Sequence, residues 1–256
     1  MVGAIFLSYS LNYVFMKKNI VLFGFLILII ASCKKESENL LYPKANEYYP
    51  LQIGKMFIYR CDSTVPCCFN ASLITKSYQA MDTVESTFTD NSGRVSYRIY
   101  RYLRDTAETQ PWRFAYTIVA TPTIDQIEYQ EENFRFIKLH NPVKNDFSWN
   151  GNSYINTSIS ENLYLDNWNY SYQKVNESYA TKGIKYDSTA TVLQIDDFSP
   201  EGPFDPNLSY QQRNYSVEVY AKGIGLVYKD FLHWVWQGNA YEDGAYGVRL
   251  SLLRHN

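Results

Sequence analysis

Apolar and polar residues alternate with a period of two in several segments of this chain, and this alternation limits the folds open to it. In segment 214–221, Tyr215, Val217 and Val219 alternate with polar side chains, and segment 97–104 shows a similar pattern. Successive side chains of a strand point to opposite faces, so the pattern predicts strands with one buried and one solvated face. In segment 214–221 we expect the face that carries Tyr215 to be the buried one.

Turn-forming residues separate these segments, and helical periodicity is weak. Aromatic residues make up 17% of the chain, a bias that favours strands. Apart from the N-terminal apolar stretch, the sequence shows no amphipathic helix of about ten residues or more. The sequence therefore predicts an all-β fold, an antiparallel curved sheet that forms a half-barrel, a barrel or a sandwich, with a helix only in the N-terminal signal segment. The turn-rich segments are 90–93, 149–152, 199–207 and 221–225.

The N-terminal residues have the pattern of a secretory signal peptide. Lys17 and Lys18 precede an uncharged apolar run over residues 20–30, which ends in small residues. The run is shorter than the ~20 apolar residues that a membrane-spanning helix needs. Met16 is then the expected start of the protein, with residues 1–15 as an upstream extension.

The small residues at the end of this run resemble a bacterial lipobox. Ile30, Ala31 and Ser32 directly precede Cys33. The resemblance implies cleavage before Cys33 and lipidation of its thiol and of the new amino terminus. A plain signal peptide with a chance cysteine and an uncleaved anchor are the alternatives. Several acyl chains on one residue give a stable attachment, so we expect the membrane as a partner through the lipid on Cys33.

These signals divide the chain into three parts. Residues 1–32 comprise the extension and signal peptide, residues 33–46 a polar flexible tether, and residues 47–256 a single β-rich domain. Lys34 stands where an aspartate would resemble an inner-membrane retention signal. The expected location is therefore the outer membrane of a bacterial envelope, on its periplasmic or its surface face.

Three further cysteines lie close together in the sequence, at Cys61, Cys67 and Cys68. An oxidising envelope favours a disulfide, and the spacing suggests that Cys61 pairs with Cys67 or Cys68 across a turn between two strands. A vicinal bond between Cys67 and Cys68 would be strained. A zinc site is the alternative, but zinc normally takes four ligands and no histidine lies nearby in the sequence, so a disulfide or inert thiols are favoured over a metal.

Signatures of catalysis and of cofactor binding are weak. His140, His233 and His255 are far apart and form no HExxH motif, and no GxSxG motif occurs. Gly223 and Gly225 lack the further glycine and the following helix of a phosphate-binding loop, so they predict a turn before a strand. The net charge of −2, without a basic stripe, disfavours nucleic acid as a partner. We expect neither enzymatic activity nor a cofactor.

The aromatic residues near the C-terminus offer a candidate binding surface. Trp234 and Trp236 share one strand face, and Tyr241 and Tyr246 follow. If that face is exposed, the four rings form a platform for sugar rings or other apolar ligands. If it faces inward, the same residues are core, which is the favoured interpretation because aromatic residues are mostly buried.

Two short segments of the chain resemble each other. Residues 50–57, PLQIGKMF, and residues 142–149, PVKNDFSW, share a proline, an aliphatic residue, a turn residue and a final aromatic residue. At this length chance is the favoured explanation, with an internal duplication as the alternative.

The order of three motifs resembles envelope lipoproteins of the Bacteroidetes type, whose function is uncharacterised. The motifs are YYPLQIGKMFIY, FRFIKLHNPVKNDFSW and VEVYAKGIGLVYKDF, and they follow the lipobox. In the middle motif Asn145 and Asp146 replace the aliphatic residue and the glycine usual in that family, so that turn is expected to differ. The resemblance implies a β-rich lipoprotein fold and no particular reaction.

Together these features predict a membrane-anchored envelope lipoprotein that acts as a non-catalytic binding or structural module, for a glycan or an apolar ligand through its aromatic residues. One alternative is a carrier of apolar ligands with a cavity in the curved sheet. A less favoured alternative is an envelope hydrolase built on Asp82 with Glu85 or on Asp196 with Asp197, because such acid pairs are common on protein surfaces.

Overall fold

The computed structural model describes residues 41–256, of which Tyr42–Asn256 form one compact unit. The signal peptide, its lipobox residues Ile30, Ala31 and Ser32, and Cys33 lie outside the described residues, so these assignments stay predictions. In the described part of the chain no helix is long and apolar enough to cross a membrane.

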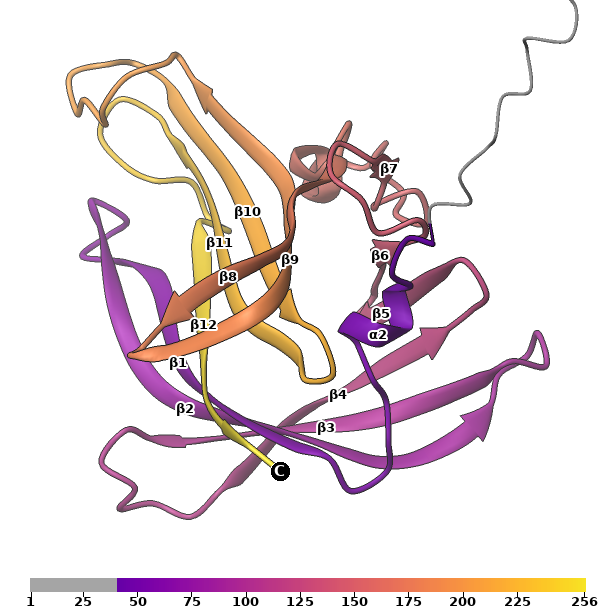
Figure 1. The fold of residues 1–256 in the computed structure, drawn as a ribbon. Helices are drawn as coiled ribbons and strands as arrows, with labels where there is room; N and C mark the ends of the chain where they lie inside the picture. Colours follow the sequence, from indigo (N-terminus) through magenta and orange to yellow (C-terminus); the bar gives the residue numbers. More distant parts are fainter. Residues whose placement is uncertain (1–40) are drawn as a thin grey trace, which may run out of the picture. The chain divides into compact units, whose positions relative to one another are not determined.

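The compact unit is one antiparallel sheet of twelve strands, which confirms the predicted all-β fold. Its spatial order is β6-β5-β4-β3-β2-β1-β12-β11-β10-β9-β8-β7, and Figure 1 shows the strands curving round a common interior. The strands are β1 Met56–Cys67, β2 Ser72–Thr89, β3 Val95–Asp105, β4 Arg113–Pro122, β5 Gln126–Glu131, β6 Phe134–His140, β7 Ser148–Asn150, β8 Asn169–Thr181, β9 Ile184–Ser199, β10 Gln211–Ala221, β11 Gly225–Trp236 and β12 Tyr246–His255, with the short helices α2 Ala45–Tyr48 and η1 Ser160–Leu165.

Two six-stranded meanders make up this sheet, β1–β6 and β7–β12, and they meet at both sides. At one side β1 pairs with β12, where Cys61 lies opposite Leu250. At the other side Ile137 N of β6 donates a hydrogen bond to Gly151 O at 2.8 Å, and Trp149 Nε1 of β7 donates to Ile137 O at 2.8 Å. These bonds bring the outer strands β6 and β7 together, so the sheet is a nearly closed barrel.

Each meander opens with the same backbone arrangement. In the first, Gly54 N donates to Val84 O at 2.8 Å, and Val84 N donates to Lys55 O at 2.9 Å. The turn residue Gly54 has φ of 87°, which glycine adopts without steric cost. The turn thereby joins the segment before β1 to β2.

The second meander repeats this arrangement residue for residue. Asp146 N donates to Tyr172 O at 2.8 Å, and Tyr172 N donates to Phe147 O at 3.1 Å. Asp146 takes the place of Gly54 and also has a positive φ, 64°, which aspartate tolerates better than most residues. The resemblance between 50–57 and 142–149 is therefore a structural repeat, and the Asp146 turn does not differ as the sequence suggested.

The segment before β1 also packs against the barrel. Tyr48 of α2 is fully buried, Ala45 N donates to Asn141 Oδ1 at 2.8 Å, and Glu47 O accepts from Gly223 N at 2.7 Å. The compact unit thus begins a few residues before the expected boundary at residue 47. Gly223 and Gly225 have φ values of 77° and 123°, and they lie in the turn before β11 and at its first residue, so the predicted turn before a strand is present.

One prediction about face orientation is wrong. In β10 the polar side chains of Ser216 and Glu218 are buried, at 1% and 2% exposed, while Tyr215 and Val217 of the expected face are only half-buried. Val219 is the member of the expected face that is buried as predicted, at 1% exposed. The reason lies in partners far away in the sequence, because the buried polar atoms find hydrogen bonds inside the barrel.

Candidate ligand-binding site

A bidentate ion pair between β2 and β3 is the first part of a group of buried and half-buried charged side chains, called the charged layer below. Its members are Asp82, Arg101, Glu131, Lys138, Glu218 and Lys229. Asp82 and Arg101 lie directly opposite each other on these paired strands. Arg101 Nε donates to Asp82 Oδ1 at 2.6 Å and Arg101 Nη2 donates to Asp82 Oδ2 at 2.6 Å. The side chains are only 5% and 10% exposed, so both oxygens of Asp82 are held by a rigid, buried fork.

A second buried pair crosses from the first meander to the second. Lys138 Nζ on β6 donates to Glu218 Oε1 on β10 at 2.7 Å, with side-chain exposures of 8% and 2%. The other carboxylate oxygen of Glu218 accepts hydrogen bonds from Gln194 Nε2 at 2.9 Å and from Tyr220 OH at 2.6 Å. Burial opposes the charge of Glu218, but Lys138 outweighs it and holds the pKa of that carboxyl below its ordinary value.

Glu131 on β5 connects the remaining charges. Its Oε1 accepts a hydrogen bond from Tyr116 OH at 2.6 Å and lies 3.5 Å from Arg101 Nη1, and its Oε2 lies 3.8 Å from Lys229 Nζ on β11. Burial alone would raise the pKa of Glu131, but the charges of Lys229 and Arg101 outweigh it and lower the pKa to about 2. Glu131 is therefore a carboxylate at neutral pH.

Lys229 is the least satisfied cation of this layer. Its side chain is 17% exposed, its nearest carboxylate oxygen is that of Glu131 at 3.8 Å, and among residues 41–256 its Nζ donates no hydrogen bond. Arg101 and Lys138, in contrast, donate bonds of 2.6 to 2.7 Å to their carboxylates. The ammonium of Lys229 thus keeps its capacity to bind a further acceptor.

A cavity of about 430 Å³ lies beside this layer and is called the barrel cavity below. Its volume falls in the ordinary range of small-molecule sites, roughly 300–1,000 Å³. Charged groups and aromatic rings both line it, and the 40% exposure of Tyr246 shows that solvent reaches its rim. The lining residues are Arg101, Tyr116, Glu131, Glu132, Phe134, Phe136, Lys138, Tyr164, Lys229, Tyr246 and Val248.

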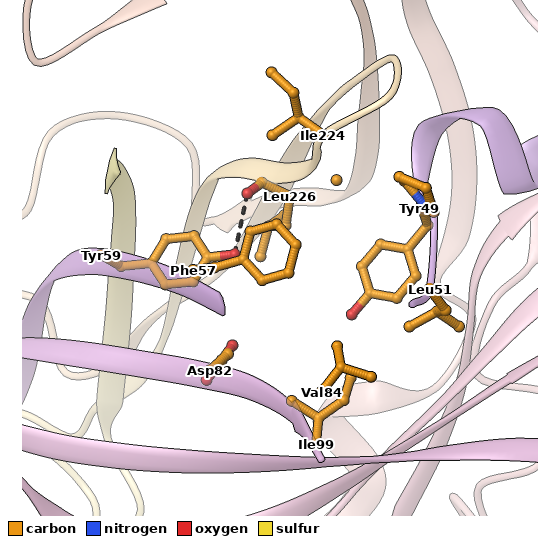
Figure 2. Close-up of a pocket in the computed structure, with 11 residues that line it drawn as sticks. Tyr49, Leu51, Phe57, Tyr59, Asp82, Val84, Ile99, Ile224 and Leu226 are labelled. Atoms are coloured by element: carbon orange, nitrogen blue, oxygen red, sulfur yellow. Dashed lines mark hydrogen bonds between the residues drawn. The ribbon is translucent and has the colours of Figure 1, made fainter. Parts of the chain in front are cut away.

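A much smaller, mainly apolar cavity has Asp82 among its lining residues. Its volume is about 20 Å³, and Figure 2 shows Tyr49, Phe57 and Val84 gathered round it. Tyr59 OH donates to Leu226 O at 3.1 Å at its edge. Such a space holds little more than one water molecule, so this cavity is too small for an apolar ligand.

A third hollow has a volume of about 740 Å³, and the Asp and Glu residues in its lining are accompanied by no Lys or Arg among residues 41–256. His233 on β11 faces it and stacks on Tyr164 with ring centroids 4.1 Å apart, while His233 Nδ1 lies 2.6 Å from Asn214 Oδ1. Burial lowers the pKa of His233 to about 4, so its ring is neutral at neutral pH. His140 bonds elsewhere, with Nδ1 2.6 Å from Asn141 O, so the fold does not bring the histidines together.

Most of the aromatic candidates lie in a core. Trp234, Trp236 and Tyr241 are 5%, 5% and 9% exposed, because Phe204 of the segment between β9 and β10 packs on all three rings. Their burial agrees with the favoured interpretation of these three rings as core and excludes an exposed platform. Tyr246 is the member of the set that lines the barrel cavity.

The expected pairing of Cys61 with Cys67 or Cys68 does not occur. Cys61 is buried in a core cluster, and all three cysteines are free. Cys61 and Cys67 lie on the same strand, β1, with six residue steps of ~3.3 Å between them, so they do not face each other across a turn. The sulfur atoms of Cys67 and Cys68 are 2.7 Å apart at the β1–β2 turn.

Neither of the two acid pairs considered for a hydrolase forms a pair of catalytic carboxylates. Asp82 is locked to Arg101, whereas Glu85 is exposed beside an irregularity between Val84 and Ser86. Asp196 pairs with Arg213 at 2.5 Å and Asp197 accepts from Gln212 at 3.0 Å. Within residues 41–256 no group of three or more His, Cys, Asp or Glu side chains is placed to hold a metal ion.

The sequence interpretation missed the charged layer as a whole. Lys138 and Glu218 carry opposite charges, and each has apolar neighbours on both sides, in FIKL and VEV. A charge between apolar neighbours is typical of the solvated face of an alternating strand and is equally compatible with a buried ion pair. The sequence therefore did not single out these two residues, and their pairing across 80 positions could not be predicted from it.

Comparison with known proteins gives little further guidance. No protein-family model and no curated protein matches the chain. A protein of Bacteroides fragilis, inferred to be exported and described with a YmcC-like fold, is similar at 11% identity and a TM-score of 0.39, covering 80% of this chain and 98% of that one. An inferred lipoprotein of Parabacteroides distasonis is similar at 11% identity and a TM-score of 0.42, covering 82% of this chain and 98% of that one. Both come from Bacteroidetes, and at these values the likeness carries no argument about function.

Proposed function

We propose that this chain is a lipid-anchored protein of the bacterial cell envelope that binds a small ligand inside its barrel without transforming it. The observation that carries the proposal is the barrel cavity, about 430 Å³ of space beside charges fixed by hydrogen bonds. Protein interiors are otherwise packed about as densely as organic crystals, so a hollow of this size lined by oriented polar groups favours ligand binding. The anchor rests on Cys33 and the residues before it.

The charged layer suits binding better than catalysis. Both oxygens of Asp82 are engaged by Arg101, and both oxygens of Glu218 accept hydrogen bonds. A general acid at neutral pH needs a raised pKa, whereas the pKa of Glu131 is lowered to about 2. These groups can hold and orient a ligand, but they are poorly placed to exchange protons with it.

The ligand site can be tested with a fluorescent probe, anilinonaphthalene sulfonate. Val248 lines the barrel cavity, so Val248→Trp fills part of it, whereas Val95→Trp adds the same side chain at a position that is 55% exposed. We expect the wild type and Val95→Trp to bind the probe similarly and Val248→Trp to bind it at least about tenfold more weakly. Equal binding by all three proteins would contradict a ligand site in the barrel cavity.

The anchor is tested separately by the intact mass of the membrane-extracted protein. We expect a chain that begins at Cys33 and carries acyl groups, and an unlipidated product from Cys33→Ala. A mass that retains the upstream residues without lipid would remove the lipid anchor and leave the ligand site untouched.

A further inference from the structure

We infer that the ligand of the barrel cavity is a small organic anion with a flat apolar ring, whose anionic group binds the ammonium of Lys229. This inference rests on the proposed function and names the ligand class for the same site. It depends on three features of the cavity, namely a cation with spare donors, neighbouring charges that are already engaged, and a wall of aromatic rings.

The spare donors belong to Lys229. An ammonium group has three N–H donors, and Lys229 Nζ has only the carboxylate of Glu131 nearby, at 3.8 Å, beyond hydrogen-bond distance. Its side chain is mostly buried, at 17% exposed, so bulk water satisfies it only in part. An anionic oxygen placed in the cavity would gain a charge-assisted hydrogen bond in a partly desolvated setting, where such bonds are strong.

The other buried charges at the cavity are already engaged. Arg101 holds Asp82 through two bonds of 2.6 Å, and Lys138 holds Glu218 at 2.7 Å. Glu131 would repel an anion, but Tyr116 OH donates to it at 2.6 Å and Arg101 lies 3.5 Å away. Glu132 also lines the cavity and forms no ion pair within residues 41–256, but it is exposed to solvent, which screens its charge. Lys229 is a counter-ion of Glu131 across 3.8 Å, yet its N–H donors make no hydrogen bond there and stay available to a ligand.

The aromatic residues of the cavity determine the apolar part of the ligand. Phe134 and Phe136 lie side by side with ring centroids 6.1 Å apart, and Tyr164 and Tyr246 complete the wall. Aromatic side chains bind flat apolar bodies through their faces and edges. A ligand with an anionic group at Lys229 and a ring against these residues would contact both the available ammonium and the aromatic rings.

Two probes that differ in one group test this class. Anilinonaphthalene sulfonate carries a sulfonate, and phenylnaphthylamine has the same ring skeleton without it. We expect the wild type to bind the sulfonate at least about tenfold more tightly, because a hydrogen bond to a charged group is involved. Lys229→Met should abolish this preference, and Lys229→Arg should keep it. Lys185→Met removes a side chain that is 67% exposed and serves as the matched control, expected to keep the preference.

The outcomes separate this inference from the proposed function. Equal binding of both probes by the wild type, or a preference that survives Lys229→Met, would overturn the anion class and leave a ligand cavity. A preference lost equally in Lys229→Met and in a folded Lys229→Arg would show that the charge is not the determinant, and would also overturn the inference. Binding of neither probe would contradict the inference and the proposed function together. The wild-type comparison holds even if Lys229→Met fails to fold.

Discussion

The two meanders begin alike and are filled differently. Gly54 in the first and Asp146 in the second occupy the same turn, with the same hydrogen bonds to the second strand of each half. Farther along, the first meander supplies Asp82, Arg101, Glu131 and Lys138 to the charged layer, and the second supplies Glu218 and Lys229. The two meanders therefore share the backbone geometry of this turn and differ in their interior side chains.

The consequence is that the candidate site belongs to neither half alone. The Lys138–Glu218 pair and the Glu131–Lys229 contact both connect the first meander with the second. The barrel cavity likewise takes Phe134 and Phe136 from β6 and Val248 from β12. The repeat therefore builds the barrel, and the differences between its copies build the site.

The largest expected effect comes from breaking the charge pair that connects the halves. Lys138→Met leaves the carboxylate of Glu218 buried without its cation, which should lower the free energy of unfolding by about 3–5 kcal/mol. Urea denaturation of the Cys33→Ala protein measures this loss. The double variant Lys138→Met with Glu218→Leu removes both charges and should recover most of it. Equal losses in the single and double variants would show that the pair is not what connects the halves.

Acid should weaken the second contact between the two meanders, which joins Glu131 and Lys229. The pKa of Glu131 is lowered from 4.5 to about 2 in the folded protein, so its contribution is fully present above about pH 4.5 and is lost as pH falls toward 2. The shift corresponds to at most about 3 kcal/mol at neutral pH. Urea denaturation between pH 2 and 6 should show this loss in the wild type and a flatter profile in Glu131→Gln. Identical profiles would contradict the assignment.

A smaller effect is expected at the seam between β6 and β7. Trp149→Phe removes the Nε1 donor to Ile137 O and some buried volume, which should cost about 1–3 kcal/mol. Amide hydrogen exchange should then speed up at Ile137 N and Gly151 more than at the β1–β12 seam. Uniform faster exchange at both seams would argue against a local closure at β6 and β7.

The smallest effects concern the repeated turn. Gly54→Ala forces a side chain into φ of 87° and should cost about 1 kcal/mol, since nothing within 4 Å adds a steric clash. Asp146→Gly relieves a positive φ and should change the unfolding free energy by less than about 0.5 kcal/mol. Thermal denaturation of both variants compares the two copies. A larger loss for Asp146→Gly would show that the copies are not equivalent.

The fold could be predicted from the sequence because its signal is local. Alternation in 97–104 and the positive φ expected at Gly223 and Gly225 depend on near neighbours in the chain, and the structure agrees with them. The orientation of β10 could not be predicted in the same way, because Glu218 is buried through Lys138, a partner from a different strand. A period of two identifies two faces, and only tertiary contacts decide which is inside.

The candidate site shows the same limit. The sequence drew attention to Trp234 and Trp236 because large rings are conspicuous, but Phe204 covers them. Of the predicted ligand-binding residues, Tyr246 lies at the barrel cavity. Nothing in the sequence distinguishes Lys229 from other lysines. It is a candidate ligand-binding residue because Arg101 and Lys138 are already hydrogen-bonded to carboxylates and Lys229, among residues 41–256, is not.

The most direct test of the account is a crystal structure of the Cys33→Ala protein soaked with a bromonaphthoate. The bromine gives an anomalous signal that locates the ring, and the carboxylate reports on the anion contact. We expect the bromine in the barrel cavity and a carboxylate oxygen within hydrogen-bond distance, roughly 2.7–3.2 Å, of Lys229 Nζ. A bromine outside the barrel, with the cavity occupied by water alone, would contradict the account.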